Sequence, residues 1–252
     1  LGEAGFGARE SFTMPADESD GPRLVFDDAT ETLFLADMSG DGLSDLVRIR
    51  TGEACYWPNL GYGRFGRKAA MGNAPVFDAP ELFEPRRLRL ADIDGSGVSD
   101  IVYTSGSDIR LYFNRSGNGW TEGLVLSNLP PIDNLTTLGV VDLLGTGTAC
   151  LVWSSPLPQD AASPLLFVDL MGSTKPHLLV QVENNLGART LVRYASSVKF
   201  YLEDQRQDRP WVTALPFPVQ VVERVEAHDD IGHNRFVTRY AYHHGYFDGA
   251  ER

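Results

Sequence analysis

Hydrophobic and polar positions alternate in short runs along most of the chain. Runs rich in β-branched and aromatic residues are bounded by clusters of Gly, Asn, Asp and Ser, which is the pattern of strands separated by tight turns. It predicts strands at 33–36, 45–50 and 54–58, and again at 88–91, 100–104 and 109–113. A period of 3.6 residues, which would indicate helices, is nearly absent. The pattern therefore predicts an all-β fold.

These strands belong to a repeat that aligns without a gap at an offset of 55 residues. Residues 33–66 read LFLADMSGDGLSDLVRIRTGEACYWPNLGYGRFG, and residues 88–121 read LRLADIDGSGVSDIVYTSGSDIRLYFNRSGNGWT. The residues that recur unchanged are Ala36, Asp37, Gly40, Gly42, Ser44, Asp45, Val47 and Asn59. A third, weaker copy occupies 138–153, and a shorter echo follows at 167–172. Units of roughly 50 residues with several short strands are typical of β-propeller blades.

The pattern changes after residues 184–187 (NNLG). Residues 189–201 and 218–228 read as long strands, 202–215 as a surface loop, and 229–242 as a turn followed by the second arm of a β-hairpin. We therefore expect two parts, propeller blades over 1–183 and a β-rich segment over 184–252. Because the chain begins at Leu1 rather than Met, we expect it to be a piece of a longer protein.

The loop between the first two strands of each repeat is acidic and has alternating oxygen-bearing positions. The first copy offers Asp37, Ser39, Asp41, the carbonyl of Leu43, and Asp45; the second offers Asp92, Asp94, Ser96, the carbonyl of Val98, and Asp100. Calcium takes about six to eight oxygen ligands in flexible geometry, and this spacing turns alternate residues toward one point. A glycine at the sixth position, Gly42 or Gly97, would permit the sharp turn that such a loop needs.

The same aspartates have a second interpretation, in which they accept hydrogen bonds from their own loop backbone as Asx-turns and bind no metal. The third copy has Leu144 and Cys150 at two of the ligand positions, so we expect no cation beside Asp142. Both interpretations of the first two loops stay open at this point. No other cofactor is indicated.

The charge of the chain narrows the classes of partner. A net charge of −12 and a pI near 4.8 oppose binding to phosphate backbones and anionic lipid, so we expect neither nucleic acid nor a membrane as partner. Proteins, sugars and cations remain. No apolar run is long enough for a membrane helix. Cys55 and Cys150 lack CxxC spacing, and we predict buried free thiols.

Catalytic motifs give little support for an enzyme. Residues 61–66 match GxGxxG, but they lie in the turn of the repeat and precede MGNAP, which cannot open a helix. His243 and His244 are neighbours on a predicted strand, so they would point to opposite faces, while His228 and His233 flank the predicted turn. We expect no catalytic activity. A hydrolase built on a propeller is the remaining enzymatic alternative.

Two stretches resemble known families. The DxxGDGxxD loop with the following NxGxGxF turn resembles FG-GAP/VCBS propeller repeats, which also occur in integrin α-subunits. The phrases VDLMGSTKPHLLVQVENNLGARTLVRYASS, RPWVTALPFPVQVVERVEAHD and TRYAYHHGYFDGAER are similar to the SpvB/TcdB-type B component of bacterial insecticidal toxin complexes, or Tc toxins. That similarity covers roughly residues 165–252, and the repeats agree with it over the rest of the chain.

The second resemblance implies a fold and a function. It implies a partial β-propeller that docks on the A component, followed by the start of an RHS-like β-shell that encloses the toxic polypeptide together with the C component. The chain would then be a protein-interaction and gating module of a B subunit, folded in the bacterial cytoplasm and secreted within the complex. The alternative is a calcium-dependent adhesin or lectin-like propeller, which accounts for the repeats but not for residues 165–252.

Overall fold

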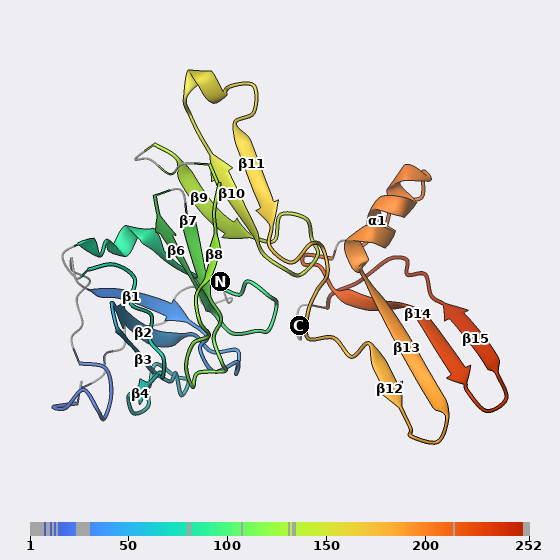
Figure 1. Cartoon of the computed structure of the whole chain (residues 1–252), viewed down its shortest axis with the longest axis horizontal. Helices are drawn as coiled ribbons and strands as arrows, with labels where there is room; N and C mark the ends of the chain where they lie inside the picture. Colours follow the sequence, from blue (N-terminus) through green and yellow to red (C-terminus); the bar gives the residue numbers. More distant parts are fainter. Residues whose placement is uncertain are drawn as a thin grey trace. The chain divides into compact units, whose positions relative to one another are not determined.

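The computed structural model describes residues 8, 11, 13, 15–23, 31–79, 82–106, 108–130, 132, 135–213 and 215–248. Over these residues the chain is mostly β, with four antiparallel sheets and few helices (Figure 1). None of the helices in the described part is long and apolar enough to cross a membrane.

The first two sheets have the same topology. Their strands are β1 (Glu31–Ala36), β2 (Asp45–Arg50), β3 (Glu53–Trp57) and β4 (Ala69–Ala70), then β5 (Leu88–Ala91), β6 (Asp100–Ser105), β7 (Asp108–Tyr112) and β8 (Leu124–Leu126). Each strand pairs with the next one along the chain. Ala36 lies opposite Asp45 in the first sheet, and Ala91 lies opposite Asp100 in the second. The register is thus offset by 55 residues, and the predicted repeat is confirmed.

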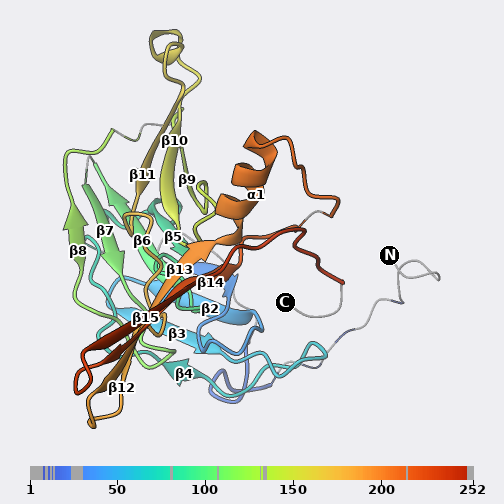
Figure 2. The same cartoon turned by 90° about the vertical axis from the view of Figure 1, so that its right-hand side faces the viewer.

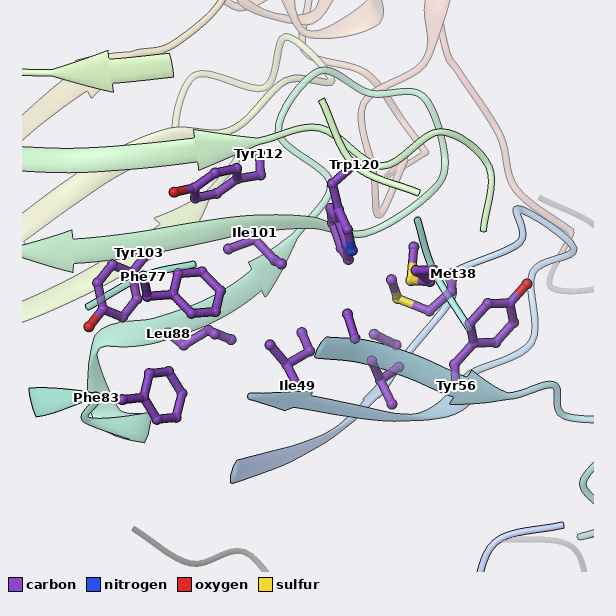
Figure 3. Packing of buried hydrophobic residues seen from close by; sticks show 14 residues of the cluster. Met38, Ile49, Tyr56, Phe77, Phe83, Leu88, Ile101, Tyr103, Tyr112 and Trp120 are labelled. Atoms are coloured by element: carbon purple, nitrogen blue, oxygen red, sulfur yellow. The ribbon is translucent and has the colours of Figure 1, made fainter. Parts of the chain in front are cut away.

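A shared apolar core joins these two sheets (Figure 3). Trp120 and Tyr103 are fully buried in it, and Ile49 reaches it from β2. Phe77, from the connection between the sheets, has its ring 4.6 Å from the tilted ring of Tyr103 and stacks at 5.7 Å on that of Phe83. Aromatic rings at these separations add to the stability that area burial provides. The connection between the repeats is therefore part of the core.

The third sheet contains β9 (Thr137–Val141), β10 (Cys150–Ser154) and β11 (Leu165–Asp169), with β10 in the centre. Its first two strands match the predicted third copy of the repeat. The echo predicted at 167–172 is not a further repeat, because β11 pairs with β10 from Cys150 opposite Asp169 to Ser154 opposite Leu165. It completes the third sheet instead.

The fourth sheet has the order β12 (Gln181–Glu183), β13 (Ala188–Ser196), β14 (Gln220–Asp229), β15 (Asn234–Arg239). The long hairpin of β14 and β15 confirms the predicted strand–turn–strand pattern (Figure 2). The second arm is shorter than predicted, because strand pairing ends at Arg239 rather than at Tyr242.

A helix interrupts the strand predicted at 189–201. Residues Ser197–Arg206 form α1, which also replaces the first part of the loop predicted at 202–215. The Ser196 hydroxyl oxygen accepts a hydrogen bond from Val198 N and caps the helix. Phe200 and Asp204, four residues apart, are buried on one side of it. The third buried position of the helix is Ser197, so two of the three are polar and no apolar period stands out in the sequence.

The chain forms two compact units. One consists of residues 1–92 and 97–134, and the other of residues 93–96 and 135–252. The division into blades over 1–183 and a second part over 184–252 stays a prediction.

Candidate functional site

The acidic loops are the candidate site, and in the first loop the carboxylates accept hydrogen bonds from the backbone. Asp37 accepts from Gly40 N and from Gly42 N, both at 2.7 Å, and Asp41 accepts from Leu43 N at 2.9 Å. Gly42 has a φ of +83°, and its equivalent Gly97 has a φ of +93°, so both need the left-handed region as predicted. The hydrogen bonds are those of Asx-turns.

The aspartate at the ninth position has a different role from the other loop carboxylates. Asp45 is fully buried, and its two oxygens accept from Met38 N at 3.0 Å and Asn59 N at 2.8 Å. Burial raises the pKa of Asp45, in spite of these two hydrogen bonds. In the second sheet Asp100 accepts from Asn114 N at 2.8 Å in the same way. In each sheet this aspartate therefore connects the end of the acidic loop to the turn after the third strand.

The second loop brings carboxylates closer together than the first. One oxygen each from Asp92, Asp94 and Asp100 lie within 4.8 Å of one another, without an ion. Gly97 N donates to Asp92, and Ser96 N donates to Asp94, both at 3.0 Å. Within the described residues, Asp37, Asp41 and Asp45 do not converge in this way.

The non-carboxylate positions of the two predicted ligand sets differ in exposure. Ser39 is half-buried and Leu43 is exposed in the first loop, whereas Ser96 is exposed and Val98 is buried in the second. Of the predicted ligands, three carboxylates come together in the second loop. No such group forms in the first loop within the described residues.

The third loop forms an Asx-turn as well. Asp142 accepts from Thr146 N at 2.9 Å and from Gly147 N at 2.8 Å, which keeps the Asx-turn. Cys150 occupies the position of Asp45 and Asp100 and is buried. The Asx-turn is thus present in the third loop even though Leu144 and Cys150 stand at two of the predicted ligand positions.

A short basic segment contacts the tips of the second and third loops. His177 Nε2 lies 2.9 Å from Asp94 Oδ2, and Lys175 Nζ donates to the carbonyls of Gly95 at 2.7 Å and Gly147 at 3.1 Å. Burial alone would raise the pKa of Asp94, but the hydrogen bonds from His177 and Ser96 outweigh it and lower the pKa. One predicted calcium ligand is therefore already paired with a basic side chain.

Sequence reasoning missed a second polar cluster, which connects α1 to the C-terminal segment. The buried carboxylate of Asp204 accepts from Trp211 Nε1 at 2.8 Å and lies 2.6 Å from His243 Nδ1. The hydrogen bond with His243 is the main cause that lowers the pKa of Asp204. Residues 240–248 form no strand, so the prediction that His243 and His244 lie on opposite faces of one is wrong. No spacing in the sequence indicates this long-range pairing.

Other predicted features are found where expected. Residues 61–66 form the turn between β3 and β4, closed by Leu60 N donating to Arg64 O at 2.8 Å, and a strand follows rather than a helix. Cys55 and Cys150 are buried free thiols, which confirms that prediction, and burial raises the pKa of both. His228 lies near the end of β14 and His233 directly precedes β15, so the two flank the turn as predicted.

Comparison with known proteins assigns this architecture to a family. The model of the family "Insecticide toxin TcdB middle/N-terminal region" matches residues 114–252. The crystal structure of TcdB2-TccC3 is 31% identical with a TM-score of 0.76, over 88% of this chain and 11% of that one. The Photorhabdus luminescens Tc holotoxin pore is 32% identical with a TM-score of 0.78, over 88% of this chain and 10% of that one. No curated protein sequence matches. The chain thus spans about a tenth of the structures it matches.

Proposed function

The chain belongs to the family of the middle/N-terminal region of the insecticide toxin TcdB, and on that premise we propose that it is a non-catalytic protein-interaction and gating module of a toxin-complex B subunit. The observation that carries the proposal is the likeness to TcdB2-TccC3 at 31% identity over 88% of this chain. In this role the module docks on the A component and leads into the shell that, with the C component, encloses the toxic polypeptide. It acts outside the cell, within the toxin complex, after folding in the bacterial cytoplasm.

We further propose that the first three sheets are blades of a propeller of the FG-GAP/VCBS type. Strands pair in sequence order within the first two sheets. Successive acidic loops are joined by backbone hydrogen bonds, from Ser99 N to Asp37 O at 2.8 Å and from Ala149 N to Ile93 O at 3.2 Å. Repeated sheets whose equivalent loops meet are what radial stacking of blades requires.

The end of the first two sheets that carries residues 37–45 and 92–100, the acidic-loop end, is the surface that we propose for docking. It concentrates aspartates, and Asp41 on it is exposed. Opposite charge on a partner would steer encounter and raise the association rate, whereas the buried apolar contacts would control dissociation. Steering is screened by salt over a Debye length of about 8 Å at physiological ionic strength.

Surface plasmon resonance with the intact B component and its A partner tests this proposal across a salt series. We expect Asp41→Lys to slow association at low salt without unfolding the protein, because Asp41 accepts only the local hydrogen bond from Leu43 N. Asp108→Lys is the matched control. Asp108 starts β7 at the opposite end of the second sheet, so we expect its reversal to leave association unchanged. Absence of binding at every ionic strength would overturn the docking role.

A further inference from the structure

One face of the fourth sheet is strongly basic, although the chain carries a net charge of −12. Cross-strand neighbours share a face, and alternate residues of each strand point the same way. Arg193 lies opposite Arg224, which lies opposite Arg239, and Arg189 lies opposite His228, which lies opposite Arg235. We call this surface of β13, β14 and β15 the basic face.

A carboxylate at the centre of the basic face shows what the arginines bind. Glu226 is buried, and its Oε2 accepts from Arg235 Nε at 2.8 Å, while its Oε1 lies 2.7 Å from Arg224 Nη2. The hydrogen bond from Arg235 is the main cause that lowers the pKa of Glu226. Arginine's planar fork matches a carboxylate in this way.

The arginines outnumber the carboxylates that could neutralise them. Glu183, opposite Arg189 at the sheet's edge, is the other acid on this face of the four strands. Asp230 lies 3.8 Å from Arg189. Arg193 and Arg239 form no ion pair with any residue that the structure describes. Like charges directly opposite each other on a sheet are destabilising, so the row of Arg193, Arg224 and Arg239 costs stability unless an anion lies over it.

Hydrogen-bond donors without acceptors on the basic face also indicate that an anion binds there. Arg189 Nε and Arg224 Nε are buried and have no hydrogen-bond partner among the described residues, whereas His228 Nε2, which makes no hydrogen bond either, lies 3.4 Å from Glu226 Oε2. Nearly all buried polar groups in folded proteins are hydrogen-bonded, and those that are not require an explanation. A groove of about 480 Å³ runs alongside, lined by Gln181, Leu191 and Arg193 among others. The face thus borders a groove at Arg193, and it has surplus positive charge and donors that lack acceptors.

We propose that the basic face binds an Asp- and Glu-rich polypeptide segment. The ligand's carboxylates would occupy the positions over Arg193 and Arg239 that Glu226 occupies between Arg224 and Arg235. A short acidic segment can engage this local surface, whereas a long nucleic acid or an anionic membrane would also meet the acidic remainder of the chain. This inference does not rest on docking to the A component, which we assign to the acidic-loop end of the first two sheets.

Fluorescence anisotropy with a labelled deca-glutamate peptide, and deca-glutamine as control, tests the proposal. We expect saturable binding of deca-glutamate that weakens with salt, and none of deca-glutamine. Arg193→Gln combined with Arg239→Gln should weaken binding at least tenfold, since each loses a charge-assisted contact. Arg67→Gln, whose side chain is 82% exposed in the other unit, is the matched control and should leave binding unchanged.

Two further measurements keep the outcome unambiguous. Arg193→Lys with Arg239→Lys keeps the charge but loses the fork, so we expect intermediate affinity. Circular dichroism and thermal unfolding establish whether the Gln variants are folded, and we expect them to be, because Arg193 and Arg239 form no ion pair with a described residue. Equal binding by the Arg67→Gln and the double Gln variants, or binding of single-stranded RNA or anionic vesicles in place of deca-glutamate, would overturn the proposal.

Discussion

The carboxylate of Asp45 accepts a hydrogen bond of 2.8 Å from the backbone N–H of Asn59, fourteen residues further along the chain. The other oxygen accepts from Met38 N, so one buried side chain closes both the acidic loop and the turn after β3. The sequence offers Asp45 as a cation ligand, but with both oxygens occupied it acts first as a structural connection.

Replacement of Asp45 by Ala should therefore destabilise the protein. An N–H left without an acceptor costs about 1–3 kcal/mol when it is buried, as Met38 N is, and less when it is partly buried, as Asn59 N is, so we expect the free energy of unfolding to fall by about 2–4 kcal/mol. Urea denaturation followed by circular dichroism measures it. Asp41→Ala removes one hydrogen bond at an exposed loop position and should cost less than about 1 kcal/mol. Equal losses in the two variants would contradict the role assigned to Asp45.

Calcium binding, where it occurs, should depend on the second loop. We expect the heat of a calorimetric calcium titration, after chelator treatment, to disappear in Asp94→Asn, because Asp94 belongs to the group of converging carboxylates. Asp142→Asn should leave it unchanged, since the third loop has Cys150 in place of a carboxylate. No heat at millimolar calcium would reduce the acidic loops to plain Asx-turns.

Lowering the pH should weaken the ion pairs of Glu18 with Arg48 and Lys68. Arg48 and Lys68 donate hydrogen bonds to Glu18 at 3.0 and 2.7 Å and lower its pKa from 4.5 to about 2. A lowered pKa stabilises the folded state above pH 4.5, and this contribution is lost as the pH falls from 4.5 to about 2. Glu18→Gln should cost less than about 1 kcal/mol at pH 7, because the side chain is 44% exposed.

The difference between wild type and Glu18→Gln should shrink as urea denaturation is repeated at pH 7, 4 and 2.5. Glu122→Gln is the control, since Glu122 forms no ion pair with a described residue. A difference that stays constant down to pH 2.5 would show that the charge of Glu18 does not contribute.

The two thiols should be unreactive in the folded protein. Cys55 and Cys150 are fully buried, and burial raises the pKa of each, so the reactive thiolate is both scarce and shielded. DTNB should react with neither thiol in buffer and with both in urea. Rapid reaction of one thiol in buffer would mean that its sheet opens readily.

Local signals made most of the sheets predictable. The strands of the first two sheets follow from short apolar runs between glycines and aspartates, and the identical residues 55 positions apart required the same fold twice. The helix α1 was missed because Ser197 and Val198 read as a continuation of β13, and because two of its three buried residues, Ser197 and Asp204, are polar.

Long-range side-chain pairing was not predictable. Arg189 and Arg193 are visibly on one face of a strand, as are Arg235 and Arg239, but which residues they meet depends on the register of β14. A shift in the register between Arg193 and Tyr194 adds to that uncertainty. The contact of Asp204 with His243 crosses 39 residues and follows from tertiary packing alone.

The third acidic loop lacks the buried aspartate that holds each of the first two, so its local stability depends on other parts of the chain. Where Asp45 and Asp100 hold their own loops through carboxylate oxygens, Cys150 offers Leu143 N and Leu144 N only a sulfur, which is a weak acceptor, and groups from later in the chain hold the loop as well. Lys175 donates to Gly147 O, Gln220 to Thr146 O at 2.6 Å, and the Ser196 hydroxyl to Gly145 O. The amides of residues 143–149 should therefore exchange with deuterium in step with the segments that carry those three side chains, as one cooperative opening unit.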